Sequence, residues 1–445
     1  MNVKLLRKLD LITGWIVFAI ATLVYFLTVE PTTSWWDCGE FIATAYKLQV
    51  THPPGAPLFQ MLGRVFTLFA SDGSTVALMI NIMSTLSSSF TILFLFWTIT
   101  MLAEKAVKST GELTQGKIYA ILGAGVVGSL AYTFSDSFWF SAVEGEVYAM
   151  SSFFTALVFW AILRWERVAD ERHNLHWIVL IAYLIGLSIG VHLLNLLAIP
   201  AIAFIFYFKR YDVSRKGIAI TGIISVVLIY FIMSLLIPGI VKLEAKTELL
   251  FVNVFGLPFN SGTIFFFLLI AFLLTWGLLY THRKRKVLLN TALLSLTFII
   301  IGYSSFFMIV IRANANPPQN MNNPSDAMSL LSYLGREQYG SWPLLYGPYY
   351  NAPLDPENPY SDGSPVYKKD KALGKYVVID DRKGVIPNYD PRFETIFPRM
   401  WSSTRSAHAE AYKVWGKIEG TPIKVTKIDG SNEIIYKPTF LENIR

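Results

Sequence analysis

Residues 177–208 form one apolar run of thirty-two residues without Lys, Arg, Asp or Glu, WIVLIAYLIGLSIGVHLLNLLAIPAIAFIFYF. A membrane-spanning helix needs about 20 apolar residues, so this run is too long for one upright span and short for two full ones. Basic residues lie on both sides of it, with Arg172 before and Lys209 and Arg210 after. Because short cytoplasmic loops collect basic residues, the chain is expected to enter the membrane and return, turning near GVHLLN.

Seven further apolar runs are long enough to cross a membrane, at 11–29, 76–103, 118–134, 147–163, 217–241, 263–280 and 287–311. Of the 445 residues 53% are hydrophobic and 16% are charged, which excludes an ordinary soluble domain. The first run has no small-residue cleavage site after it and should remain as an anchor. Cys38 is the single cysteine, so no disulfide can form within the chain. The sequence predicts an all-α polytopic membrane protein with about nine membrane segments.

The distribution of basic residues sets the predicted orientation. The amino terminus and the loops after residues 103, 163, 208 and 280 are rich in Lys and Arg, and the loops between them are not. This pattern places the amino terminus inside and the segments 30–75, 135–146 and 312–445 outside. A single crossing at 177–208 would instead put the sequence HRKRK outside.

The chain divides into a predicted transmembrane domain, 1–311, and an extracytoplasmic α+β segment, 312–445. In the second part, GTPIKVTKIDGSNEIIYKPTF alternates apolar and polar residues around a Gly-Ser-Asn turn, the pattern of a β-hairpin. Residues 324–339 predict a short amphipathic helix that begins at Ser325 or Asp326.

The sequence SWWDCGEF follows the first predicted span and begins the outer loop. Trp35 and Trp36 suit the headgroup level of a membrane, and a short interfacial helix should follow them. Asp37 and Glu40 are three apart and share a face of that helix. Two interpretations stay open: Ser34 and Asp37 form a capping box at the helix start, or Asp37 is a positioned general base.

The sequence THPPGAP ends this interfacial helix, because Pro53 drives His52 out of the helical region and the Pro-Pro-Gly run makes a stiff turn. Arg64 then stands alone among Leu and Phe on a second short helix. Its side chain can extend to lipid phosphate, the commoner case, or hold the phosphate of a substrate.

A second acidic group lies in SDSFWFSAVEGEVYAM, which contains Asp136, Glu144 and Glu146. Carboxylates in hydrocarbon cost about 2.5 to 3.5 kcal/mol, so this segment should face water, protein or a ligand. Glu144 and Glu146 would point to opposite sides of a helix, and one of them would favour the positive end of the helix that follows. His192 and Asn195 make a third polar group, although each alone is more often a helix–helix contact.

No metal-binding spacing occurs among the remaining histidines, and no phosphate-binding glycine loop, nucleophile elbow or nucleic-acid module is recognisable. The unusual acids and imidazoles gather instead on the predicted outer side. A transporter would distribute polar residues through the middle of its spans, at broken helices. A one-sided site is typical of membrane enzymes that take a sugar from a lipid phosphate carrier.

Five ordered motifs resemble the family known as domain of unknown function 2723, which includes the transmembrane protein 260 type of protein O-mannosyltransferase and many Bacteroidota membrane proteins. The motifs are WWDCGEF, THPPGAPLF, AVEGEVYA, GVHLLNLL and NPPQNMNNPSDAMSLLSYLGREQYG. The similarity runs from about residue 10 to at least 350. Relatives carry further spans after the outer segment, so this chain is short or truncated by comparison.

The resemblance implies a GT-C-type fold and an inverting transfer of a sugar, mannose for the named relatives, from a polyprenyl-phosphate carrier to Ser or Thr of proteins. It places the protein in a bacterial inner membrane with the active site facing the periplasm. Two other functions stay open: a transporter or flippase of a lipid-linked molecule, and a non-catalytic scaffold of the envelope.

The site residues follow from the same resemblance. Asp37, with Glu40 beside it, would take the proton from the acceptor hydroxyl. The expected substrate-binding residues are His52, Arg64, Glu144, Glu146, His192, Asn195 and Arg312, of which the cationic ones would stabilise the leaving phosphate. No cofactor is certain; a divalent metal, needed by some GT-C enzymes, would find oxygen ligands in Asp37, Glu40 and Glu144. Met321 replaces an acidic or amide residue of relatives, which weakens a catalytic role there.

Overall fold

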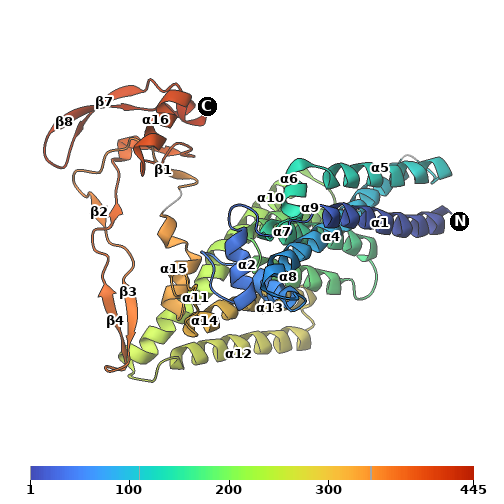
Figure 1. Ribbon diagram of the computed structural model, residues 1–445, viewed down its shortest axis with the longest axis horizontal. Helices are drawn as coiled ribbons and strands as arrows, with labels where there is room; N and C mark the ends of the chain where they lie inside the picture. The colour runs from blue at the N-terminus through green and yellow to red at the C-terminus, as the bar shows by residue number, and fades with distance from the viewer. Residues whose placement is uncertain (1, 110, 341–342) are drawn as a thin grey trace. The chain divides into compact units, whose positions relative to one another are not determined.

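The computed structural model describes residues 2–109, 111–340 and 343–445, and it is mostly helical (Figure 1). The chain forms two compact units. The first, here called the helical unit, comprises Met1–Glu248 and Asn260–Gly335. The second, the β-containing unit, comprises Leu249–Phe259 and Arg336–Arg445. Residues 312–335, which the sequence assigned to the outer segment, cluster with the helical unit.

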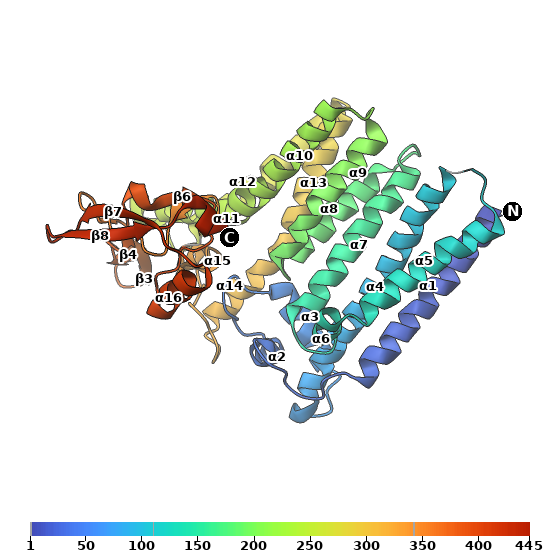
Figure 2. The same ribbon diagram turned by 90° about the horizontal axis from the view of Figure 1, so that it is seen from above.

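Long apolar helices build the helical unit, and several of them lie side by side in the order α1, α4, α7, α8, α13 and α12 (Figure 2). Their bounds are α1 Asn2–Leu27, α4 Val76–Lys108, α7 Val147–Val168, α8 Leu175–Ile189, α13 Val287–Tyr303 and α12 Ser261–Arg283. The others are α5 Gln115–Thr133, α6 Asp136–Ala142, α9 Ile199–Arg210, α10 Arg215–Tyr230, α11 Ile237–Leu249 and α14 Phe307–Asn314.

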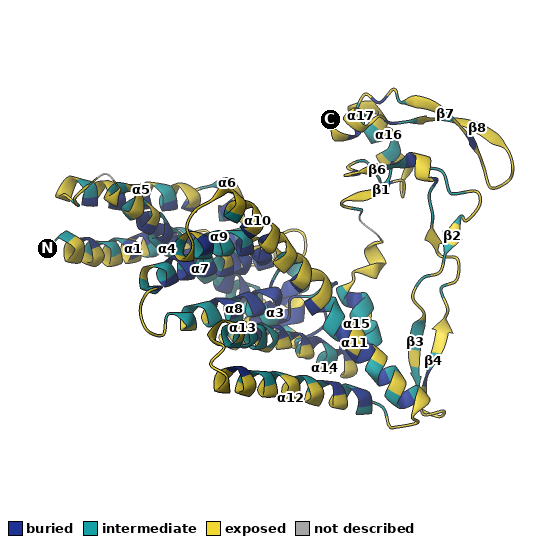
Figure 3. Cartoon of the chain, turned by 180° about the vertical axis from the view of Figure 1, so that it is seen from behind, coloured by how far each residue is buried: buried dark blue, intermediate teal, exposed yellow. Residues whose placement is uncertain are grey.

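Within the described residues, seven helices or continuous helical runs are long and apolar enough to cross a membrane. The bent pair α5 and α6 would make an eighth. The structure does not confirm nine, because α8 has only 15 residues and a length of about 22 Å. Large apolar side chains are exposed along α12, among them Phe272 and Trp276, and Figure 3 shows this exposure. Such a surface is stable in lipid, and it indicates an integral membrane protein.

The predicted turn within 177–208 is confirmed as two apolar helices, α8 and α9, joined by a 3-10 segment at Leu193–Ala198. Helix α8 packs directly on α13 because two glycines allow their backbones to touch. A Cβ on Gly186 would lie 2.4 Å from the carbonyl oxygen of Ile299, and a Cβ on Gly302 would lie 2.4 Å from the amide nitrogen of Leu187. Small residues at membrane helix crossings permit this close approach.

The segment between α1 and α4 contains a short helix where one is predicted, α2 Cys38–Lys47, followed by α3 Pro57–Thr67 and a 3-10 turn at Gly73–Thr75. Phe41, Ile42 and Ala45 form the buried face of α2 and join a hydrophobic cluster with residues of α3, α4 and α7. The Pro-Pro-Gly turn between α2 and α3 contains a cis Pro53–Pro54 peptide, and the Gly55 N–H donates to the carbonyl oxygen of His52 (2.9 Å).

Helix α15, Ala327–Leu334, confirms the predicted amphipathic helix. Asp326 is its N-cap and exchanges hydrogen bonds with Ser329 in a capping box. The Tyr333 hydroxyl donates to the carbonyl oxygens of Thr51 (2.7 Å) and His52 (3.2 Å). Helix α15, which lies at the end of the helical unit in sequence, thus supports the Pro-Pro-Gly turn.

Among its described residues, the β-containing unit has four two-stranded antiparallel pairs. They are β1 Tyr346–Pro348 with β6 Glu394–Ile396, β2 Tyr360–Ser361 with β5 Ile386–Pro387, β3 Val366–Asp370 with β4 Lys375–Asp380, and β7 Thr421–Thr426 with β8 Asn432–Lys437. Two short helices complete it, α16 Ser406–Trp415 and α17 Phe440–Ile444. The predicted hairpin is confirmed as β7 and β8, in which Thr426 pairs with Asn432 across the turn.

Candidate active site

Asp37 stands at the start of α2, but its side chain does not cap the helix. The capping box predicted for Ser34 and Asp37 is therefore wrong. The backbone turns sharply at Trp36, which has a φ of 60° and is 87% exposed, so α2 begins only at Cys38. Because the Asp37 carboxylate is not used by the helix end, it can face the neighbouring loop.

His52 lies in that loop, and both carboxylate oxygens of Glu40 contact it. The backbone N–H of His52 donates to Glu40 Oε1 (2.6 Å), and ring atom Nδ1 lies 3.0 Å from Glu40 Oε2. The other ring nitrogen, Nε2, lies 4.0 Å from Asp37 Oδ2. Glu40 and Asp37 thus face one imidazole, as their spacing on a shared helix face predicted.

The charged groups around His52 shift one another's pKa values. Its hydrogen bond to Glu40 raises the pKa of His52 above its ordinary value, although burial acts in the opposite direction. Burial by itself would raise the pKa of Glu40, but the bonds from His52 outweigh it and hold that pKa below its ordinary value. The pair is therefore most strongly bound when Glu40 is ionised and His52 is protonated.

The Glu-Gly-Glu motif of residues 144–146 approaches the same region. Gly145 packs so tightly that a Cβ there would lie 2.9 Å from Asn81 Oδ1 and 3.1 Å from Ile42 Cγ1, so the motif lies against both α4 and α2. Glu146 is the N-cap of α7 and accepts from the Val147 N–H. Burial first, and then the charges of Asp37 and Glu144, raise the pKa of Glu146 to about 7.

Glu144 is 4% exposed, and its Oε2 has no hydrogen-bond partner among the described residues. It interacts with the thiol of Cys38, the residue next to Asp37, whose pKa is raised by burial and by both glutamates. Asp37, Glu40 and Glu146 thus act on the imidazole of His52, and Glu144 lies against Cys38 beside them. The set of Asp37, Glu40, His52, Glu144 and Glu146 is here called the acid–imidazole cluster.

His192 and Asn195 lie beside this cluster in different ways. The His192 ring lies 5.5 Å from the ring of Tyr148, which belongs to the first turn of α7. Asn195 is buried, and its Oδ1 accepts from the hydroxyls of Ser151 (2.9 Å) and Thr155 (2.7 Å). Asn195 thus makes a contact with α7, and its binding of substrate stays a prediction. Tyr148 is a neighbour of His192 that sequence reasoning did not find.

Arg64 and Arg312 both bind the carboxyl end of α2. The Arg64 guanidinium donates to the carbonyl oxygen of Tyr46 (2.8 Å), and Arg312 donates to those of Lys47 (3.1 Å) and Leu48. Cations are favourable at this end of a helix dipole. The two arginines fix the position of α2 in the structure, and their binding of a substrate phosphate stays a prediction.

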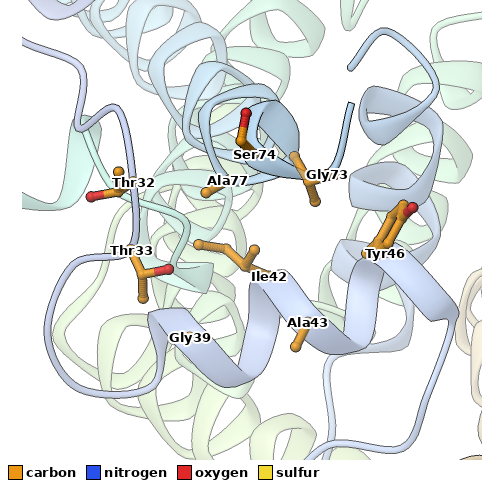
Figure 4. Close-up of a pocket in the computed structure, with 10 residues that line it drawn as sticks. Thr32, Thr33, Gly39, Ile42, Ala43, Tyr46, Gly73, Ser74 and Ala77 are labelled. Atoms are coloured by element: carbon orange, nitrogen blue, oxygen red, sulfur yellow. The ribbon is translucent and has the colours of Figure 1, made fainter. Parts of the chain in front are cut away.

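A pocket of about 360 Å³ with a mixed polar and apolar lining lies beside α2 (Figure 4), and neither Asp37 nor Glu40 lines it. Gly39, Ile42, Ala43 and Tyr46 form its floor at helical spacing. Its remaining lining residues come from two other segments, Thr32 and Thr33 from the loop before α2, and Gly73, Ser74, Val76 and Ala77 from the 3-10 turn and the start of α4 that follows it. The sequence did not predict it, because three of its floor residues are small or apolar and would serve equally well in a core.

Three groups of the cluster could hold a metal ion. One ligating atom each from Asp37, Glu40 and His52 lies within 4.8 Å of the others. Among the described residues this group contains His52, which was not a predicted ligand, and it does not contain the predicted ligand Glu144. Both oxygens of Glu40 already bind His52. A requirement for a metal stays a prediction.

The opposite pKa shifts of Glu40 and His52 predict a bell-shaped stability contribution. The lowered pKa of Glu40 adds stability that is present above its ordinary value of 4.5 and is lost as the pH falls through the folded value. The raised pKa of His52 adds stability that is present below its ordinary value of 6.5 and is lost as the pH rises through the folded value. We expect the difference in melting temperature between wild type and Glu40→Gln to be largest between these two values. A difference that does not change with pH would contradict the pairing.

The apolar helices define an integral membrane protein. The acid–imidazole cluster is a polar site outside its spans, with members in and just before α2, in the loop after α2 and just before α7. Residues 37–215 match the family model described as the protein O-mannosyl-transferase TMEM260 N-terminal domain. Residues 340–445 match a family of unknown function, DUF8416. No solved structure matches the chain.

Two curated relatives are similar to the same part of the chain. The protein O-mannosyl-transferase tmem260 of Dictyostelium discoideum is 28% identical over 220 residues, which are 47% of this chain and 25% of that protein. The protein O-mannosyl-transferase TMEM260 of Mus musculus is 30% identical over 173 residues, 39% of this chain and 22% of that protein. This chain thus spans about a quarter of the length of the curated relatives it matches.

Proposed function

We propose that the protein is a membrane glycosyltransferase that moves a sugar from a polyprenyl-phosphate carrier to Ser or Thr hydroxyls of proteins. One observation carries the proposal: the region that matches the O-mannosyltransferase family begins at Asp37 and contains every member of the acid–imidazole cluster. The sugar proposed is mannose, because both relatives are named as O-mannosyltransferases. Membership of the domain of unknown function 2723 family and a GT-C-type fold belong to the same proposal.

The charge of the cluster suits this chemistry. The anomeric carbon of a sugar becomes positively charged in the transition state of glycosyl transfer. Asp37, Glu40 and Glu146 place three carboxyl groups near one imidazole, and ionised carboxylates there would stabilise a positive charge. In a single displacement, the acceptor oxygen bonds to the anomeric carbon while the bond to the carrier phosphate breaks, which inverts the configuration.

An apolar groove supports a lipid-linked donor. It has a volume of about 670 Å³ and runs between α8, α9, α10 and α13, with isoleucines such as Ile185, Ile199 and Ile299 in its walls. Water is excluded from such a groove in a membrane, so a hydrocarbon chain is its natural occupant. We propose that it receives part of an isoprenoid tail.

The test is sugar transfer by the purified full-length protein in lipid nanodiscs. We expect radiolabelled mannose to pass from mannosyl polyprenyl phosphate to a Ser- and Thr-containing acceptor peptide. Parallel reactions with the free sugar or a nucleotide sugar should give no transfer. Movement of the intact lipid-linked sugar across vesicles, without transfer to peptide, would overturn the enzyme proposal in favour of a flippase.

The proposed orientation, with the cluster on the extracytoplasmic side of a bacterial inner membrane, predicts a labelling pattern. Cys38 is fully buried and its thiol pKa is raised, so the unmodified protein should not react with an impermeant maleimide in intact cells. Lys371→Cys should react, and Lys284→Cys should react only after permeabilisation. Both positions are exposed lysines, which makes them a matched pair. Labelling of the cysteine at residue 284 in intact cells would contradict the proposed orientation.

A further inference from the structure

We propose that His52 is the general base of the transfer reaction and that Glu40 is the residue that positions it. Sequence reasoning gave the proton to Asp37 and assigned His52 to the substrate phosphate. His52 can hold this role only if the proposed function is correct, since a base is needed for the attack of a hydroxyl.

The hydrogen bonds of Glu40 determine which ring nitrogen is available. An ionised carboxylate is only an acceptor, so the 3.0 Å contact between Glu40 Oε2 and Nδ1 requires the proton on Nδ1. In the neutral ring, Nε2 then carries the lone pair. The bond from the His52 backbone N–H to Glu40 Oε1 prevents the carboxylate from rotating away. A carboxylate that fixes the tautomer and orientation of a histidine base is a recurring catalytic arrangement.

The surroundings of His52 favour a base over a phosphate ligand. Four groups that can titrate face it: Asp37 and Glu40 from α2, Glu146 from the start of α7, and Tyr333 from α15, whose hydroxyl binds the His52 carbonyl oxygen. Three of them are acids, so a phosphate would be repelled, whereas an imidazolium formed during the reaction would be stabilised. The bond to Glu40 also makes the ring more basic than an unperturbed histidine.

In the proposed reaction, proton transfer to His52 accompanies a single displacement at the sugar. The acceptor hydroxyl gives its proton to Nε2 of His52 while its oxygen forms the new bond to the anomeric carbon. The bond between that carbon and the phosphate oxygen breaks, and its electron pair leaves with the polyprenyl phosphate. The imidazolium faces Glu40 at Nδ1 and Asp37 at Nε2, and it returns its proton to water after product release.

The first experiment measures transfer by the full-length His52→Ala variant with and without added imidazole. We expect the rate to fall by about 10²–10⁴, the usual value of a positioned base. Imidazole should restore part of the activity, because the truncated side chain leaves space for it beside Glu40. An unchanged rate, or a folded and inactive variant that imidazole does not rescue, would overturn the proposal.

The second experiment uses the pH dependence of kcat/KM, so that the test does not depend on the His52 variant folding. We expect a rising limb at or above pH 6.5 in wild type, and a shift of that limb to lower pH in Glu40→Gln, because the raising effect of Glu40 is lost. Asp136→Asn is the matched control, since Asp136 is an exposed acid in α6 outside the cluster. A limb that stays in place in Glu40→Gln would contradict the positioning role. Absence of transfer by wild type would instead reject the proposed function itself.

Discussion

Replacing Asp37 by asparagine is expected to lower the rate of sugar transfer by about 10²–10³, the usual loss when one electrostatic contact to a transition state is removed. Asp37 lies 4.0 Å from Nε2 of His52, so its charge would stabilise an imidazolium formed there during the reaction. The fold should not change, because the Asp37 side chain makes no cap hydrogen bond to α2.

The measurement is the transfer rate across pH together with the melting temperature. We expect the melting temperature of Asp37→Asn to equal that of wild type above the pH at which His52 loses its proton and to fall slightly below it at lower pH, because Asp37 also raises the pKa of His52. For the same reason, the rising limb of kcat/KM should persist at a lower pH. Asp136→Asn should match wild type in rate. If the limb disappears in Asp37→Asn, Asp37 rather than His52 is the base; transfer at the wild-type rate would remove Asp37 from the reaction.

Replacing Gly302 by leucine is expected to prevent folding of the helical unit. The new Cβ would lie 2.4 Å from the amide nitrogen of Leu187 and 2.5 Å from the carbonyl carbon of Gly186, and neither backbone atom can move independently of its helix. Helices α8 and α13 would have to separate, which we expect to cost more than about 4 kcal/mol.

The matched control is Gly123→Leu, because Gly123 also lies in an apolar helix but has no atom near its Cβ position. We expect Gly123→Leu to give a monodisperse peak in size-exclusion chromatography in detergent, and Gly302→Leu to aggregate or be degraded. A monodisperse, active Gly302→Leu protein would show that the two helices are not packed in this way.

Features with a local cause were predictable from the sequence. The alternation of basic and non-basic loops was enough to predict that 177–208 turns back, and the structure has α8 and α9 there. The hairpin β7–β8 and the start of α15 at Asp326 were likewise predicted, since turn residues and capping residues act over a few positions. The count of nine spans was not confirmed, because length alone does not show whether a helix such as α8 crosses.

Features that depend on distant contacts were not predictable. The pairing of Glu40 with His52 across twelve residues requires the Pro-Pro-Gly turn to place the ring, and no periodic pattern reports that geometry. The capping box failed because the left-handed backbone at Trp36 moves the helix start to Cys38. The contacts of Arg64 and Arg312 with the carbonyl oxygens at the end of α2 were not predicted, because one of them joins residues 312 and 48.

The contacts of Arg312 and Tyr333 determine how much of the chain a working site requires. The region that matches the O-mannosyltransferase family ends at residue 215, yet α2 and the turn beside His52 are held by α14 and α15. A fragment cut at the end of the matched region would keep the whole acid–imidazole cluster and lose the two groups that fix its supports. The smallest fragment that keeps the geometry of the cluster therefore extends through residue 335. A chimera that joins the cluster of one relative to the later helices of another would keep that geometry only if it restored the contacts of Arg312 and Tyr333.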